Sequence, residues 1–153
     1  MANTYTQMNV QAVFAVKRRE NLIQKNWCDE LHRYIAGTLK ETGNYPLAVG
    51  GYKDHVHVFF ELNPAMAVSD ILRNIKAKSS KWINSEGLID GQFNWQSGYG
   101  AFTYSKSQRS NVINYILKQE EHHRGQTFKN EYLGLLDDYD IKYEDAYMFE
   151  FYE

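Results

Sequence analysis

The sequence of 153 residues contains a single cysteine, Cys28. One thiol excludes an internal disulfide framework and any zinc site built from several cysteines. No apolar run approaches the roughly 20 residues needed to cross a bilayer. The N-terminal stretch MANTYTQMNVQ lacks the basic and apolar segments of a secretion signal. We therefore expect a soluble cytoplasmic protein that does not associate with membranes.

Internal repeats, low-complexity tracts and Gly/Ser linkers are also absent. The length is that of one domain, and a chain of this size buries roughly 70% of its unfolded surface. With 43% hydrophobic and 24% charged residues, the composition is that of a folded globular protein.

The net charge of −2 is unevenly distributed along the chain. Residues 1–130 hold 16 lysines and arginines against 11 acids, a net charge of +5. Residues 131–153 hold Lys142 against eight acids, a net charge of −7. We expect residues 1–130 to form the domain and residues 131–153 to be an acidic C-terminal extension. Because the two charges largely cancel, the overall value does not exclude a nucleic-acid partner.

Hydrophobic periodicity predicts the secondary structure, because apolar residues recur every second position in a half-buried strand and about every 3.6 positions in a helix. The expected elements are a strand at 7–14, a helix from about 21 to 43, strands at 45–52 and 55–62, a helix from Ser69 as N-cap through Ile83, a strand or hairpin at 92–105, a helix from Ser107 to about Gly125, and a short helix at 127–137.

The order β-α-β-β-α-β, then α, indicates the α+β class. It is typical of a ferredoxin-like (RRM-like) split βαβ antiparallel sheet with helices on one face, here followed by a C-terminal helix that carries Tyr115. The first two helices leave the other face of the sheet uncovered. We expect a partner subunit, the last helix or a ligand to lie on that face.

The run Asp54-His55-Val56-His57-Val58-Phe59-Phe60 places both histidines on one face of a strand. Two imidazoles at this spacing suit a single divalent metal. Ordinary polar residues on a solvated sheet face are the alternative.

Tyr115 and Gln119 are one helical turn apart. They lie outside the apolar stripe that we expect to be buried, which consists of Val112, Ile113, Ile116 and Leu117. Seen alone, the pair is equally compatible with a boundary tyrosine beside a solvated glutamine.

Together, a His-hydrophobe-His strand and a later Tyr-x-x-x-Gln helix resemble the HUH endonuclease superfamily, and specifically the single-tyrosine transposases of the insertion sequence 200/605 family. The resemblance extends from about Met8 to Gln119 and includes the segments KAKSS at 76–80 and WQSGYGAF at 95–102. It implies a metal-dependent endonuclease and strand transferase that moves a small mobile element. Tyr115 would attack single-stranded DNA, leaving a 5′-phosphotyrosine link and a free 3′-hydroxyl.

The resemblance also implies that His55, His57 and Gln119 hold one Mg²⁺ or Mn²⁺, which polarises the scissile phosphate. Asp54 is a candidate to orient an imidazole, and His122 to approach the metal or a phosphate. The implied partners are single-stranded DNA with hairpin ends and a second copy of the chain, in a homodimer with composite active sites.

Two basic clusters are candidates for DNA contact, although basic side chains are often merely solvated. They are Lys17, Arg18 and Arg19 after the first strand, and Arg73, Lys76, Lys78 and Lys81 on the second long helix.

Three alternatives compete with the transposase interpretation. Two lie within the superfamily: a domesticated nuclease that acts on chromosomal palindromes, and a nicking enzyme of replication or plasmid transfer, against which the lone Tyr115 with Gln119 four residues on argues. Outside it, the chain is a non-catalytic nucleic-acid-binding module that stacks bases on an open sheet. Only the last would keep its full function after Tyr115→Phe.

Overall fold

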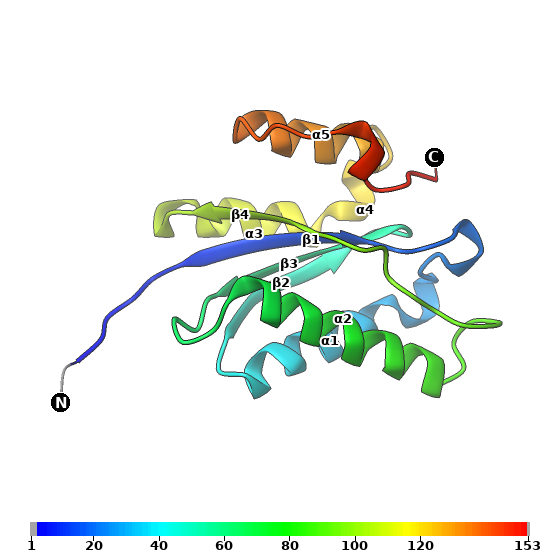
Figure 1. The fold of residues 1–153 in the computed structure, drawn as a ribbon, viewed down its shortest axis with the longest axis horizontal. Coiled ribbons are helices and arrows are strands. Elements are labelled where there is room, and N and C mark those ends of the chain that lie inside the picture. Colours follow the sequence, from blue (N-terminus) through cyan, green and yellow to red (C-terminus); the bar gives the residue numbers. More distant parts are fainter. Residues whose placement is uncertain (1–2, 153) are drawn as a thin grey trace.

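The computed structural model describes residues 3–152. At its centre is a four-stranded antiparallel sheet with the spatial order β2-β3-β1-β4 (Figure 1). The strands are β1 (Asn9–Ala15), β2 (Tyr45–Gly51), β3 (His55–Glu61) and β4 (Gly100–Tyr104). This is the expected α+β split βαβ sheet of the ferredoxin-like fold.

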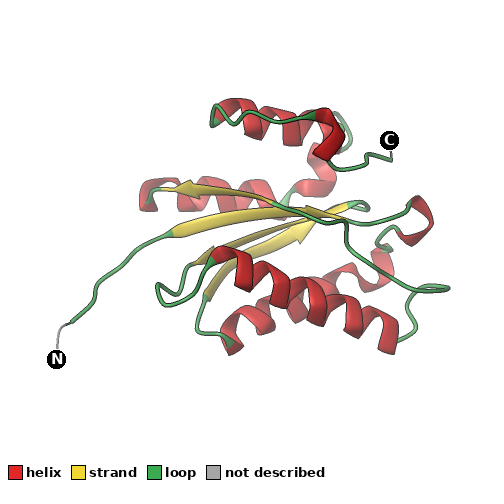
Figure 2. Ribbon diagram, in the orientation of Figure 1, coloured by secondary structure: helices red, strands yellow, loops and turns green. Residues whose placement is uncertain are grey.

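Helices cover both faces of the sheet (Figure 2). On one face lie α1 (Lys25–Glu41) and α2 (Val68–Ser85). On the other lie α3 (Arg109–Leu117), α4 (Gln119–His122) and α5 (Phe128–Asp138). Single 3-10 turns form η1 (Arg19–Asn21), η2 (Lys106–Gln108) and η3 (Asp145–Tyr147). The last helices of the chain therefore cover the face that the sequence leaves open.

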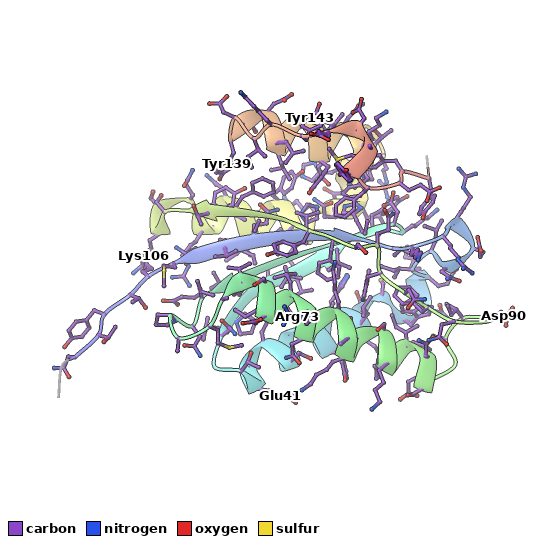
Figure 3. The ribbon with its side chains drawn as sticks, viewed as in Figure 1. Glu41, Arg73, Asp90, Lys106, Tyr139 and Tyr143 are labelled. Atoms are coloured by element: carbon purple, nitrogen blue, oxygen red, sulfur yellow. The ribbon has the colours of Figure 1, made fainter. Side chains whose placement is uncertain are left out.

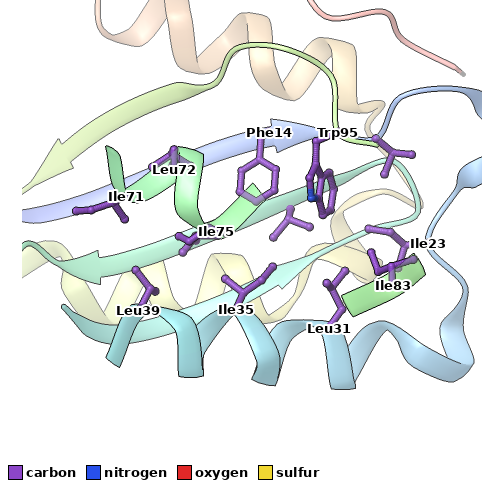
Figure 4. Close-up of a cluster of buried hydrophobic side chains, with 14 of the residues drawn as sticks. Phe14, Ile23, Leu31, Ile35, Leu39, Ile71, Leu72, Ile75, Ile83 and Trp95 are labelled. Carbon is purple, nitrogen blue, oxygen red and sulfur yellow. The ribbon is translucent and has the colours of Figure 1, made fainter. Parts of the chain in front are cut away.

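The larger core lies between the sheet and the first two helices (Figure 4). The alternating apolar residues of β1 and β3 meet the apolar stripes of α1 and α2, as the two periods predict. The members of this core include Val10, Ala12, Phe14, Leu31, Ile35, Val56, Val58, Phe60, Ile71, Ile75 and Trp95.

A second core lies between the opposite face and α5. Val13 and Ala15 of β1 and Phe102 of β4 pack there against Phe128, Tyr132, Leu136 and Phe149. Every residue of β1 is consequently buried, which corrects the expectation of a half-buried strand. The expected boundary between residues 130 and 131 falls inside α5.

The tyrosine helix α3 approaches β2 closely at Gly50. A Cβ atom at this position would collide with the carbonyl oxygen of Ile116 and lie 3.0 Å from its Cγ2 atom. Around this contact, Ala48 and Phe59 pack against Val112 and Ile116. A side chain larger than hydrogen at residue 50 would displace α3.

The structure corrects several expected helix ends. Ser69 lies within the first turn of α2, because that helix begins after Ala67. Ser105, rather than Ser107, caps the turn that leads into α3, because its side chain and that of Gln108 satisfy each other's backbone in a capping box. The expected helix from Ser107 to Gly125 is interrupted at Lys118, whose φ of −105° and ψ of 24° depart from helical values.

Two expected extents in the same region are also wrong. Leu117 is 63% exposed rather than part of the buried stripe, because it lies at the last position of α3. Within residues 92–105, regular strand pairing is restricted to β4, and Trp95 makes only an isolated bridge with Val16.

Candidate active site

Two histidines of β3 form the base of the site. His55 and His57 are fully buried on the sheet face that α3, α4 and α5 cover, with their ring centroids 5.0 Å apart. The intervening Val56 points into the larger core on the other side. The two-residue period of a strand predicts that the histidines and Val56 lie on opposite faces of the sheet. The face that carries the histidines is not solvated, however, because helices cover it.

The break after α3 brings an amide and a phenol to the same place. The Gln119 Oε1 atom lies 2.9 Å from Nε2 of His55. The Tyr115 ring lies edge-on to His57, with 6.0 Å between the centroids. Tyr115 therefore reaches the histidines of its own chain.

A carboxylate from α5 completes the cluster. Glu131 is 3% exposed, and its Oε1 atom lies 3.0 Å from Nε2 of His57 and 3.3 Å from Nε2 of His55. Its Oε2 atom accepts hydrogen bonds from the Tyr115 hydroxyl and, at 3.0 Å, from Nε2 of Gln119. Among residues 3–152, Glu131 is thus the one that contacts the proposed nucleophile Tyr115 and all three expected metal ligands, His55, His57 and Gln119.

Further side chains contact the Nδ1 atoms of the two imidazoles. Oδ1 of Asp54 lies 2.7 Å from Nδ1 of His55. Nε2 of Gln11 lies 2.8 Å from Nδ1 of His57, and the Tyr104 hydroxyl donates to Oε1 of Gln11 at 2.7 Å. Such partners fix ring orientation and direct both Nε2 atoms into the cluster.

His122, the last residue of α4, and His123, which follows it, occupy different positions. His122 packs beside Tyr115, with 4.4 Å between the ring centroids. His123, whose side chain is almost completely buried, lies with Nε2 3.1 Å from Oε1 of Gln119 and 3.3 Å from Oε1 of Glu131.

Burial and the concentration of hydrogen bonds shift the pKa values in opposite directions. Burial alone would raise the pKa of Glu131, but hydrogen bonds from His123, His55 and His57 hold it well below the usual range. Burial lowers the pKa of His55, but Asp54 and Glu131 outweigh it and raise that pKa to about 9. Burial and the neighbouring Glu131 carboxylate raise the pKa of Tyr115 far above 10. The phenol is therefore protonated in this arrangement.

The donor set fits a divalent cation. One ligand atom from each of His55, His57 and Glu131 lies within 4.8 Å of the other two. The amide oxygen of Gln119 lies beside them. Imidazole nitrogens with carboxylate and amide oxygens are ligands that suit Mn²⁺ and, less closely, Mg²⁺.

The basic residues of α2 lie across the sheet from this cluster, as Arg73 does from Tyr139 in Figure 3. Arg73 pairs with Asp70 at 2.8 Å, Lys78 pairs with Glu41 at 2.9 Å, and Lys81 is exposed. Lys76 instead donates to the backbone oxygens of Gln96 and Gly98, and burial lowers its pKa to about 8.

The other basic cluster lies near the site end of the sheet. Lys17, Arg18 and Arg19 are exposed and follow β1 where Ala15 pairs with His55. The backbone N–H of Arg18 donates to the Tyr152 hydroxyl at 2.6 Å. The C-terminal segment therefore returns to this basic cluster.

Three residues of the site, Glu131, His123 and Gln11, are not among those that the sequence predicts. Nothing in the local pattern distinguishes Glu131 from the other acids of the C-terminal segment, and its position depends on how α5 docks. His123 depends on the break at Lys118. Gln11 carries the one usable sequence indication, since its alternation on β1 places it opposite the core residues Val10 and Ala12.

Comparisons with known proteins agree on one family. The family model described as "Transposase IS200 like" matches residues 4–119. The ISDra2 transposase TnpA of Deinococcus radiodurans is 22% identical over 121 residues, which cover 75% of this chain and 86% of that protein.

Two solved structures show the same fold. A putative transposase from Deinococcus radiodurans superposes with a TM-score of 0.60 at 19% identity, covering 76% of this chain and 93% of that one. A REP-associated tyrosine transposase bound to a REP hairpin superposes with a TM-score of 0.58 at 15% identity, covering 80% of this chain and 73% of that one.

The family model, together with the shared fold, thus defines this chain as a DNA transposase. More particularly, because the family model spans most of its length, this chain belongs to the IS200-like transposases. In the part of the chain that the structure describes, no helix is long and apolar enough to cross a membrane.

Proposed function

We propose that this transposase cleaves and rejoins single-stranded DNA through a 5′-phosphotyrosine intermediate on Tyr115, and so moves a small insertion sequence with hairpin ends. The observation that carries the proposal is the direction of the Tyr115 hydroxyl. It points into a buried cluster of His55, His57, Gln119 and Glu131, the kind of donor set that binds and polarises a phosphate through a cation.

The reaction is a transesterification at phosphorus. The Tyr115 Oη atom forms a bond to phosphorus while the bond from phosphorus to the 3′ oxygen breaks. The proton of this hydroxyl, which is hydrogen-bonded to Glu131 Oε2 before the reaction, passes to solvent. The departing oxygen takes up a proton from solvent and becomes the free 3′-hydroxyl. A later attack by a 3′-hydroxyl on the same phosphorus rejoins DNA and returns the phenol.

We further propose His55, His57 and Gln119 as ligands of Mg²⁺ or Mn²⁺, with Glu131 as an additional, anionic ligand. A bound cation would polarise the scissile phosphate and offset the negative charge that keeps the Tyr115 phenol protonated. Asp54 and Gln11 would hold the two imidazoles with Nε2 directed at the ion.

The two basic clusters proposed to contact DNA differ in how close they lie to the site. Lys17, Arg18 and Arg19 lie exposed at the site end of the sheet and are well placed for phosphates. Arg73, Lys78 and Lys81 lie on the far side, so DNA that touched them would have to pass around the sheet. Lys76 is occupied by backbone oxygens.

The relative solved with a REP hairpin supports a hairpin substrate for this chain as well. We retain the homodimer with composite active sites and the cytoplasmic location as proposals. In the described arrangement Tyr115 serves the histidines of its own chain, so a composite site would require exchange of α3 and the segments after it between two copies.

A cleavage assay tests the reaction. The protein is incubated with single-stranded oligonucleotides from the DNA flanking its coding sequence, with Mn²⁺ or with EDTA, and products are separated on a denaturing protein gel. We expect a protein–DNA adduct that requires Mn²⁺ and disappears in Tyr115→Phe. The matched control is Tyr147→Phe, at a residue of η3 that is 85% exposed. Tight DNA binding without an adduct in any metal would favour the non-catalytic binding module.

A further inference from the structure

A cavity adjoins the cluster on the side away from His55. It has a volume of about 430 Å³ and lies between η2, α3 and α5, above β1 and β4. The residues that line it without belonging to the cluster include Tyr104, Gln108, Asn111, Gln126, Leu135 and Asp138. Tyr115 and Glu131 line both the cavity and the cluster. The cavity therefore opens directly beside the proposed nucleophile.

The charge of the cavity does not suit a phosphate. Among its lining residues in the described chain there is no lysine or arginine, and the charged members are Glu131 and Asp138. Backbone phosphates would be repelled here, whereas an uncharged ring would not. The size is ample for one nucleobase and its sugar.

Its polar groups are free to bind a ligand. No hydrogen bond or ion pair within residues 3–152 uses the side chains of Asn111, Gln126 or Asp138, and all three are exposed. Gln108 uses its Oε1 atom for Ser105, which leaves its NH₂ group available. Tyr104 and Leu135 supply flat and apolar walls. Amides and a carboxylate beside an aromatic ring are the groups with which proteins bind an unpaired base.

We propose that this cavity receives the nucleobase next to the scissile phosphate, and that Asp138 selects a base with an exocyclic amino group. The inference rests on the proposed function, because a phosphate held at Tyr115 Oη would bring one of its two flanking bases to the cavity. The Asp138 carboxylate only accepts hydrogen bonds. Placed against the exocyclic substituent of the base, it favours cytosine, adenine or guanine, each of which carries an amino donor there, over thymine, which presents carbonyl oxygens there and whose one donor is the ring N3–H.

The test uses single-stranded oligonucleotides in which each of the four bases occupies either position beside the mapped cleavage point. Adduct formation with Mn²⁺ is measured for the wild type and for Asp138→Asn, Asn111→Ala and Asp137→Asn. Asp137→Asn is the matched control, since it removes the same charge from an exposed neighbour on α5 that does not line the cavity.

At one of the two positions, we expect the wild type to react about tenfold faster with the best amino-bearing base than with thymine. Asp138→Asn should reduce that ratio to about twofold, because its amide also donates to the thymine O4 atom. Asp137→Asn should keep the ratio. A ratio near one in the wild type, or one unchanged in both Asp138→Asn and Asn111→Ala, would overturn the inference and leave the proposed reaction intact.

A binding measurement separates this inference from the reaction. Oligonucleotides with 2-aminopurine at the same positions are bound to the Tyr115→Phe protein, and their fluorescence is recorded. We expect quenching from contact with Tyr104, reduced at least threefold by Asn111→Ala. If no adduct forms but this quenching is seen, the reaction is wrong and the base pocket stands. The absence of quenching at both positions would reject the pocket.

Discussion

The Tyr115 hydroxyl donates a hydrogen bond to Glu131, which lies sixteen residues further along the chain on a different helix. The same carboxylate contacts His55 and His57. It therefore joins the proposed nucleophile to the proposed metal ligands. Burial and, after it, the negative charge of Glu131 raise the pKa of Tyr115, and the imidazole hydrogen bonds stabilise that charge in turn. A change at Glu131 should alter metal binding and tyrosine reactivity together.

Glu131→Gln removes the charge while keeping the shape of the side chain. We expect Mn²⁺ affinity, measured by titration calorimetry, to fall about 10- to 100-fold. Glu120→Gln is the control, because Glu120 lies on α4 with its side chain 55% exposed and pairs with Lys25. Equal Mn²⁺ affinity in Glu131→Gln and the wild type would show that Glu131 is not a ligand.

Mn²⁺ should stabilise the folded chain, because the ligands converge only when β3, α4 and α5 are assembled. At a concentration 100 times its dissociation constant, the ion contributes about 2.7 kcal/mol. For a chain of this length, the melting temperature should rise by roughly 5–10 °C. We expect His57→Ala to lose this rise, measured against its own metal-free melting temperature. A rise of equal size in His57→Ala would place the ion elsewhere.

Gly50→Ala should displace α3, because the added Cβ meets the carbonyl oxygen and Cγ2 of Ile116. We expect the free energy of unfolding to fall by about 1–3 kcal/mol and adduct formation to fall with it. Gly37→Ala on α1 is the contrast, because a Cβ there has no atom within 4 Å. That substitution should raise stability by about 0.5–1 kcal/mol. Urea denaturation of both variants gives the comparison, and wild-type stability in Gly50→Ala would contradict the close approach.

His32 should make stability depend on pH. Burial lowers its pKa to about 4 in the folded chain, against an ordinary value of 6.5, although Asp29 partly opposes the shift. As the pH falls from 6.5 towards 4, the unfolded chain binds a proton that the folded chain still excludes, so the free energy of unfolding decreases. Between pH 7 and 5 this group accounts for at most about 2 kcal/mol. His32→Gln should abolish that part of the decrease in urea denaturation, and the exposed neighbour change Arg33→Gln should keep it.

Truncation after Asn130 tests whether residues 131–153 are an appendage to the domain. The truncated chain loses Tyr132, Leu136 and Phe149, which are buried against the sheet. Each such side chain contributes about 1.5–3 kcal/mol on burial. We therefore expect a large fall in melting temperature, by calorimetry. A truncated chain with an unchanged melting temperature would support the boundary after residue 130 that the charge distribution indicates.

The sheet and the direction of its histidines could be predicted from the sequence, because both follow from local periods. His55 and His57 share a face with each other and not with Val56 wherever the strand lies. The docking of α5 follows no local period, so Glu131 could not be singled out among the C-terminal acids. The importance of Gly50 could not be predicted either, since it depends on a contact with Ile116, which is more than sixty residues away in the sequence.

Helix ends could likewise be predicted only in part from the sequence. Ser69, Ser105 and Ser107 are all acceptable N-caps by residue type. Only Ser105 has a glutamine three positions on whose side chain returns the hydrogen bond. The interruption at Lys118 has no proline or glycine to indicate it, although it directs Gln119 and His123 at the sheet.

The family match ends at residue 119, while Glu131 lies on α5 beyond it. The two histidines, the tyrosine and the glutamine therefore lie within the segment that the family model matches, and the carboxylate lies outside it. On the proposed function, one reaction centre is then shared between a part of the chain that the family model spans and a part that it leaves unconstrained. A relative could exchange its last helix and acquire a tyrosine of different acidity without altering a single residue of the shared motifs.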